Sequence, residues 1–133
     1  MRKRESTLWK WYSEYIKIRD CLETTGTINE GICITCQKRV PRFGSHAGHF
    51  IHDKKSTYYI EFNTHLQCSH CNHYLSGNLG LYGVAMVEKY GKKAVQELIR
   101  KSNQEVKQLK KFEIKEMATK YRLLVKDLLK KHA

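Results

Sequence analysis

Two Cys-x2-Cys pairs enclose the part of the chain that is richest in residues able to do chemistry. Cys33 and Cys36 form the first pair, and Cys68 and Cys71 form the second. Four thiolates from two such pairs suit a tetrahedral Zn²⁺ ion. The 31 residues between the pairs exceed the roughly 12 to 20 that separate the pairs of compact zinc fingers. We therefore expect a structural zinc ion that holds together the ends of a functional insert.

The alternatives for these cysteines are two disulfides or four ordinary thiols. Cysteines with only two residues between them rarely form a disulfide with each other. The first residues, MRKREST, carry charge but no apolar signal segment follows them, which argues against an oxidising compartment. Zinc is therefore the favoured interpretation.

Three residues in this region have the types that phosphodiester hydrolysis requires. The reaction needs a base that deprotonates water, a divalent cation that stabilises charge on the phosphate, and a rigid frame. His49 is the candidate general base, and Asn63 can tie a loop to a strand and orient His49. Asn72, directly after a zinc ligand, can offer a carbonyl oxygen to Mg²⁺ or Mn²⁺. This pattern predicts a ββα-metal nuclease centre, also called a His-Me finger.

The elements that position these residues predict an α+β fold with one domain. A helix is expected at 6–23, a zinc-bound core at 31–78, and a helical region with a basic amphipathic last helix at 79–133. Inside the core we expect a strand at 32–35, a basic turn, and a hairpin. The two strands of that hairpin are expected at 46–52 and 57–62, joined by the polar loop 53–56.

The outer helices show clear apolar periodicity. In the first helix, Ser6 or Thr7 can cap the start, an aromatic stripe is expected to be buried, and Trp9 lies off that stripe as a candidate exposed contact. Apolar spacing predicts a helix ending near Gly91, a short one at 94–100, and a long one at 112–131. The apolar face of the last helix must pack either on the domain or against a second protomer, which makes a homodimer possible.

The formal charge of +12 on 133 residues indicates a polyanionic partner, either nucleic acid or an anionic membrane. No apolar run approaches the roughly 20 residues that span a bilayer. We therefore expect a cytoplasmic protein that does not insert into a membrane. The charge alone leaves both polyanionic partners open, and the nuclease pattern described above favours DNA. The basic residues expected to contact phosphates flank the insert: Lys38, Arg39, Arg42, Lys54 and Lys55.

The sequence also resembles a known family. The strings CITC, HAGHF, FN, QCSHCNHYLSGN, VEKYGKKAVQELI and FEIKEMATKYRLLVKDLLK are similar to the NinG/Rap recombination endonucleases of lambdoid phages. The resemblance implies a phage protein of the HNH superfamily that cuts branched DNA, of Holliday-junction or D-loop type, during recombination. The CxxC and CxxCN arrangement is also similar to phage endonuclease VII. Matched position by position, His49 is the catalytic histidine, Asn63 the central asparagine and Asn72 the metal-binding residue, and the four cysteines are the zinc ligands.

One position departs from the HNH pattern. Many HNH sites carry a metal-binding aspartate immediately before the catalytic histidine, and here that position is Gly48. NinG-like sequences have Asp-Ala-Gly-His, and His46 stands where that aspartate would be. His46 is therefore the candidate second ligand of the catalytic metal, which would favour Mn²⁺ over Mg²⁺; Asp53, His52 or a water could serve instead.

Two other functional interpretations remain open from the sequence. One is a non-catalytic, zinc-stabilised nucleic-acid-binding module, which the missing aspartate favours. The other is an adaptor that binds a protein partner through the last helix; its complex would survive high salt, whereas phosphate binding weakens steeply as salt rises.

Overall fold

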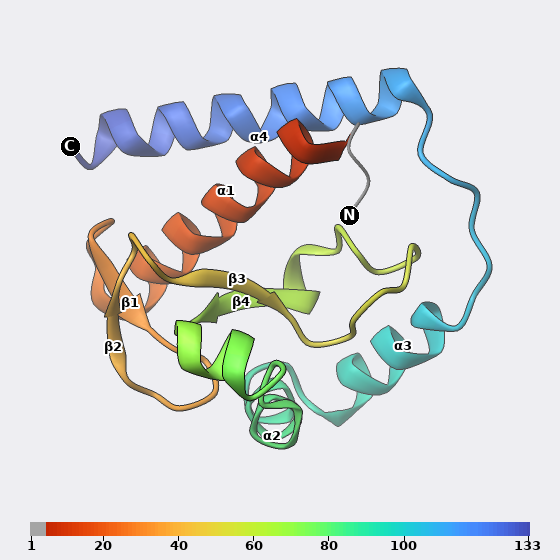
Figure 1. The fold of residues 1–133 in the computed structure, drawn as a ribbon, viewed down its shortest axis with the longest axis horizontal. Helices are drawn as coiled ribbons and strands as arrows, with labels where there is room; N and C mark the ends of the chain where they lie inside the picture. Colours follow the sequence, from red (N-terminus) through yellow and green to blue (C-terminus); the bar gives the residue numbers. More distant parts are fainter. Residues whose placement is uncertain (1–4) are drawn as a thin grey trace.

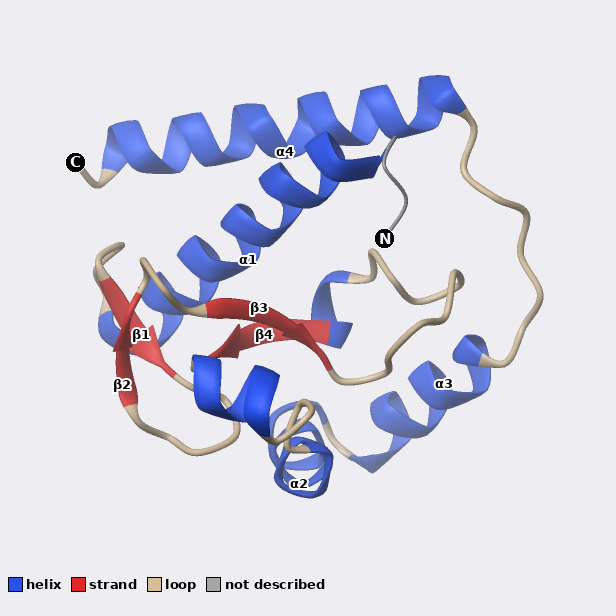
Figure 2. Ribbon diagram, in the orientation of Figure 1, coloured by secondary structure: helices blue, strands red, loops and turns tan. Residues whose placement is uncertain are grey.

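The computed structural model describes residues 5–133 as an α+β fold in which helices surround two small antiparallel sheets (Figure 1). The helices are α1 (Ser6–Thr25), α2 (Leu79–Tyr90), α3 (Lys92–Ser102) and α4 (Lys111–Lys131). The strands are β1 (Glu30–Ile32), β2 (Arg39–Pro41), β3 (His46–His49) and β4 (Thr64–Gln67), paired as β1–β2 and β3–β4. A 3-10 turn covers Glu61–Asn63 and a π-helical turn covers His70–Tyr74. Figure 2 shows α1 and α4 on one side of β3–β4, with α2 and α3 on the other.

Helix α1 runs two residues beyond its predicted end at residue 23 and stops directly before Gly26. Gly26 adopts a φ of 79°, and its N–H donates to the carbonyl of Leu22 at 3.0 Å. A residue without a Cβ adopts this left-handed conformation at little cost. The predicted cap at Ser6 or Thr7 is wrong, because both residues lie inside the helix or at its first position and Glu5 takes the N-cap position.

The apolar faces of α1 and α4 pack against each other and form the main core. Leu8, Tyr12 and Ile16 of α1 cluster with Ile114 and Tyr121 of α4. A neighbouring cluster joins α1 to α4 through Ile18, Ile28 and Val125. This packing answers the question left open by the sequence, since the apolar face of the last helix is buried within its own chain.

The predicted hairpin is wrong in its second strand. β3 pairs with Thr64–Gln67 in the register His46↔Gln67 to His49↔Thr64, whereas segment 57–62 is a loop that runs into the 3-10 turn. Apolar residues of that segment, such as Ile60 and Phe62, face a core cluster without strand pairing. All four residues of β4 are buried, so the strand lacks the alternation of polar and apolar residues that identifies a half-exposed strand.

The first zinc-ligand pair lies on a small hairpin instead of on a strand of its own. The predicted strand at 32–35 is shifted, because β1 ends at Ile32 and pairs with β2 inside the segment predicted as a basic turn. The N–H of Cys33 donates to the carbonyl of Lys38 at 2.9 Å. Gln37 turns the chain with a φ of 65° and donates its N–H to the carbonyl of Cys33.

The edge of β4 that does not face β3 is satisfied by groups outside the sheet. Asp20 Oδ2 accepts the N–H of Leu66 at 2.7 Å, and the guanidinium of Arg19 donates to the carbonyls of Glu61 and Thr64. The N–H of Ile34 donates to the carbonyl of Leu66 at 2.9 Å. Arg19 and Asp20 also bond each other at 2.8 Å. α1 therefore completes the sheet with charged side chains.

Across residues 5–133, none of the helices is both long enough and apolar enough to cross a membrane.

Replacing Asp20 by alanine should lower the free energy of unfolding by about 3 kcal/mol, because it leaves the buried N–H of Leu66 without its acceptor and the partly buried guanidinium of Arg19 without its carboxylate partner. Asp20 is 4% exposed. Urea unfolding followed by circular dichroism measures the change. Glu116→Ala, at an exposed position of α4, is the matched control and should change the value by less than about 0.5 kcal/mol. Equal stability of the two variants would contradict this role of Asp20.

Candidate functional site

The four predicted zinc ligands come together. The sulfur atoms of Cys33, Cys36, Cys68 and Cys71 lie within 4.8 Å of one another, and all four thiols are free. The Sγ atoms of Cys36 and Cys68 are 3.7 Å apart. Four sulfurs at about 2.3 Å from a tetrahedral Zn²⁺ would be about 3.8 Å from one another. The cluster therefore has the ligand set and the size for a structural zinc ion.

Hydrogen-bond donors surround the sulfur atoms, as thiolate ligands require. The N–H of Cys71 donates to Cys68 Sγ at 3.3 Å, and Thr35 Oγ1 lies 3.2 Å from Cys33 Sγ. Burial alone would raise the pKa of the Cys33 thiol, but hydrogen bonds from the backbone of Cys36 and from Thr35 bring that pKa to about 7. The Cys33 thiolate, which is the form that binds zinc, is therefore accessible near neutral pH. Burial raises the pKa of the Cys36 and Cys68 thiols, whose protons a bound zinc ion would displace.

Asn78 adds a donor that the sequence did not predict in this role. Its Nδ2 points at Cys71 Sγ at 3.5 Å, and its φ is 50°. In the structure Asn78 stands at the N-cap position of α2 with its side chain directed to the cysteine cluster.

His49, the predicted general base, is the last residue of β3 and lies among aromatic side chains. Its ring stacks on Trp9 with centroids 5.2 Å apart and lies 4.4 Å from the ring of Tyr58. His49 Nε2 is 2.8 Å from the carbonyl oxygen of Tyr58. A carbonyl only accepts, so Nε2 carries the hydrogen and the lone pair of the neutral ring lies on Nδ1. Burial lowers the pKa of His49, which keeps the ring neutral at physiological pH.

Asn63 holds the loop between β3 and β4. Its side chain is fully buried and bonds the chain at two places. Oδ1 accepts the N–H of Ile51 at 2.8 Å, and Nδ2 donates to the carbonyls of Ile51 and Thr57 at 3.1 Å. Because one of these bonds holds Thr57, the residue directly before Tyr58, it also helps to fix the carbonyl that orients His49.

A chain of hydrogen bonds from α2 reaches the residue before His49. Tyr82 donates to the carbonyl of Gly48 at 2.7 Å, and His65 Nδ1 lies 3.2 Å from the Tyr82 oxygen. The His65 ring is buried and its other nitrogen meets the hydroxyl of Tyr90. Burial lowers the pKa of His65 to about 3, so this histidine is a neutral support for β3.

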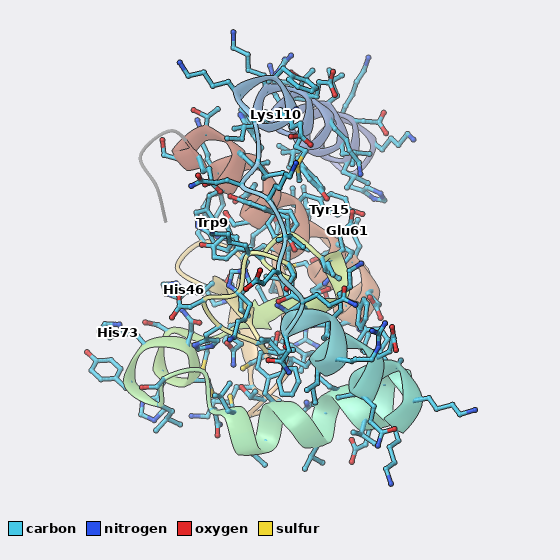
Figure 3. The ribbon with its side chains drawn as sticks, turned by 90° about the vertical axis from the view of Figure 1, so that its right-hand side faces the viewer. Trp9, Tyr15, His46, Glu61, His73 and Lys110 are labelled. Atoms are coloured by element: carbon cyan, nitrogen blue, oxygen red, sulfur yellow. The ribbon has the colours of Figure 1, made fainter. Side chains whose placement is uncertain are left out.

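Of the two predicted ligands of the catalytic cation, Asn72 lies beside Gly48 and His46 lies two residues before it on β3. Asn72 sits in the π-helical turn, and its Oδ1 is 2.8 Å from the point where a Cβ on Gly48 would lie. His46 is half-buried opposite Gln67 in the β3–β4 register. Burial lowers the pKa of His46, and Lys17 and His73 lower it further. Figure 3 shows Trp9, His46 and His73 along one side of the molecule.

Comparison with known proteins supplies the family. The family model described as bacteriophage lambda NinG protein matches residues 2–131 of the chain. The chain belongs to the NinG family. No curated protein and no solved structure matches it. The predicted resemblance to NinG is therefore confirmed, and with it the phage character of the sequence.

The predicted phosphate-contacting residues do not form one patch in this NinG-family chain. Lys38 and Arg39 are exposed on the β1–β2 hairpin, and Lys54 and Lys55 are exposed on the loop after β3. Figure 1 shows that hairpin and that loop at opposite ends of β3–β4.

Arg42 requires a correction, because it is buried and serves the fold. Its guanidinium bonds Glu14, and its Nε donates to the carbonyl of Ile28 at 2.6 Å. The sequence offered no local signal for this burial, since the acceptors lie 14 and 28 positions away.

Three residues have roles at the site that the sequence did not predict, or predicted only in part. Trp9 was expected as an exposed contact, and it is half-buried against His49. Tyr58, expected inside a strand, supplies the carbonyl that orients His49. Gln67 directs a buried oxygen at the space beside Gly48. Only the position of Trp9 off the buried stripe of its helix was visible in the sequence.

Cys68→Ser should remove zinc from the NinG-family cluster and destabilise the fold, because structural zinc binding is coupled to folding. The expected result is less than one equivalent of zinc by mass spectrometry and a lower melting temperature. Cys21→Ser is the matched control, since Cys21 is buried outside the cluster and its loss should leave the zinc content unchanged. Normal zinc content in Cys68→Ser would show that the ligand set is misassigned.

Proposed function

We propose that this NinG-family chain is a metal-dependent DNA endonuclease that hydrolyses phosphodiester bonds at branched recombination intermediates. The observation that carries the proposal is the arrangement of His49. Its Nε2–H is fixed on the carbonyl of Tyr58, and that carbonyl lies in a loop held by Asn63. A neutral imidazole held in one tautomer, with the other nitrogen free to accept a proton, is what a general base requires.

The surroundings of His49 support the same chemistry. β3, the Asn63-bonded loop and the π-helical turn would together form the small ββα frame of a His-Me finger, and the cysteine cluster would fix that turn beside β3. Asn72 would hold a Mg²⁺ or Mn²⁺ ion through its carbonyl oxygen. When bound, the cation would stabilise negative charge on the phosphate and on the leaving oxygen. His49 would take the proton from the attacking water.

The positive charge of the chain fits a DNA substrate, and cleavage of a junction would require a dimer. The formal charge of +12 would strengthen binding to phosphates, with Lys38, Arg39, Lys54 and Lys55 as the exposed contacts. Symmetric cleavage of a four-way junction requires two active sites, so a homodimer is part of the proposal. The face of α4 formed by Ile114, Tyr121 and Val125 is not available for it, because these side chains pack inside the chain.

One observation favours a second candidate, a non-catalytic nucleic-acid-binding module stabilised by zinc. Among residues 5–133, the four cysteines are the only group of three or more histidine, cysteine or acidic side chains positioned to hold a metal. A nuclease cation would therefore depend on amide oxygens and on the substrate.

His49→Ala should reduce single-turnover cleavage of a four-way junction by about 10² to 10⁴, the range for losing a general base. Zinc content and DNA affinity should stay close to those of the wild type. Because burial lowers the pKa of His49, wild-type cleavage should rise with pH and level off below about pH 6.5, the ordinary value for histidine.

His132→Ala, at an exposed position near the end of the chain, is the control and should cleave at the wild-type rate. Cleavage by His49→Ala at the wild-type rate would remove His49 as the base. Binding without cleavage by the wild type under any metal and pH would favour the non-catalytic module.

A further inference from the structure

Gln67 occupies the space that a side chain at position 48 would need. A Cβ built on Gly48 would lie 1.9 Å from Gln67 Oε1 and 2.8 Å from Gln67 Cδ. Real Cβ atoms do not approach other atoms this closely, so residue 48 can carry a side chain only if Gln67 moves. Position 48 is where many HNH sites carry the metal-binding aspartate. In this chain the amide oxygen of Gln67, from β4, lies where the Cβ of that aspartate would be.

The orientation of the Gln67 amide is fixed from its other end. Nε2 donates to the carbonyl of Gly77 at 2.9 Å and to Thr35 Oγ1 at 3.2 Å. Since the carbonyl of Gly77 can only accept, the nitrogen must face it and Oε1 must face Gly48. The side chain is fully buried, and its Oε1 has no hydrogen-bond partner within residues 5–133.

A buried carbonyl oxygen without a hydrogen-bond partner is unfavourable, because it has lost its contact with water and gained no donor in exchange. Beside it, Asn72 Oδ1 lies 2.8 Å from the same Gly48 point. Both amide oxygens therefore approach the same side of Gly48. Two such oxygens close together repel each other, and a cation bound by both would offset that repulsion. The π-helical turn holds Asn72 in place, because its N–H donates to the carbonyl of the zinc-cluster residue Cys68 at 3.0 Å.

We propose that Gln67 Oε1 and Asn72 Oδ1 are paired ligands of the catalytic divalent cation, and that Gln67 replaces the missing carboxylate at position 48. The inference rests on the proposed nuclease function for the role of the site. It differs from the prediction based on sequence, which made His46 the second ligand. His46 is the cross-strand neighbour of Gln67, and the proposed pair does not need it.

The donor set determines which cation binds and how tightly. Amide oxygens are hard ligands that suit Mg²⁺, Mn²⁺ or Ca²⁺. Both ligands are neutral, so the protein alone should bind the cation weakly, and the phosphate of the substrate would contribute the negative charge. Cation affinity should therefore increase when DNA is bound. An imidazole ligand at His46 would instead favour softer transition metals.

Mn²⁺ binding to the zinc-loaded protein, followed by electron paramagnetic resonance, tests the pair independently of cleavage. Gln67→Met removes the oxygen with little change in volume and should raise the Mn²⁺ dissociation constant by about tenfold or more, because ligand number and charge set affinity. Gln96→Met, at an exposed position of α3, and His46→Ala should stay within about twofold of the wild type. Zinc content and melting temperature verify that each variant is folded.

Two further variants keep the test decisive if Gln67→Met does not fold. Gly48→Ala should weaken Mn²⁺ binding, because its methyl group must displace Gln67 Oε1. The double variant Gly48→Asp/Gln67→Ala should bind Mn²⁺ at least as tightly as the wild type, since a carboxylate then takes the place of the amide oxygen.

The proposal is overturned if Gln67→Met and Gly48→Ala bind Mn²⁺ as the wild type does, or if only His46→Ala weakens binding. These outcomes are separable from failure of the proposed function. Loss of Mn²⁺ binding in Gln67→Met, together with a wild type that never cleaves DNA, would support the ligand pair and reject the nuclease. Cleavage that survives in Gln67→Met with unchanged Mn²⁺ affinity would support the nuclease and reject the ligand pair.

Discussion

The β3–β4 pair depends on groups outside the sheet, and the candidate site depends on that pair. A two-stranded ladder is marginally stable by itself in water, yet this one carries His49 at one strand end and Gln67 at the other. Arg19 and Asp20 of α1 bond the backbone groups on the edge of β4 that does not face β3, and the N–H of Ile34 in the β1–β2 hairpin bonds a further one. The long α1–α4 core therefore acts on the site through two charged side chains, the buried Asp20 and the partly buried Arg19.

The two ends of the β3–β4 ladder are held by different groups, the cysteine cluster at one end and the Asn63 side chain at the other. At the Gln67 end the cysteine cluster joins the β1–β2 hairpin to the π-helical turn, which places Asn72 beside Gly48. At the His49 end Asn63 holds the loop whose Tyr58 carbonyl orients the imidazole. The proposed base His49 is thus separate from the residues that hold the frame, whereas Gln67 serves both, because its amide nitrogen bonds Gly77 and Thr35 while its oxygen faces Gly48.

The sequence predicts what local patterns and fixed spacings encode. The two Cys-x2-Cys pairs predict the cluster, and apolar periodicity predicts the amphipathic helices. Prediction from the sequence fails where contacts with distant parts of the chain determine the position of a residue. Segment 57–62 has the composition of a strand, but the partner of β3 is the fully buried β4, which carries no alternation. Arg42 looks like a surface cation until Glu14 and Ile28 are brought to it. The relation of Gln67 to Gly48 appears only once the register of β3 and β4 is known.

The most direct test of the account is a single-turnover cleavage panel with the zinc-loaded wild-type protein. Four-way junction, flap, linear duplex and single-stranded DNA are compared at equal concentration, without added divalent ion and with Mg²⁺ or Mn²⁺. We expect cleavage of branched DNA that requires the added ion and exceeds cleavage of linear duplex. Tight binding of branched DNA with no cleavage under any of these conditions would contradict the proposed function.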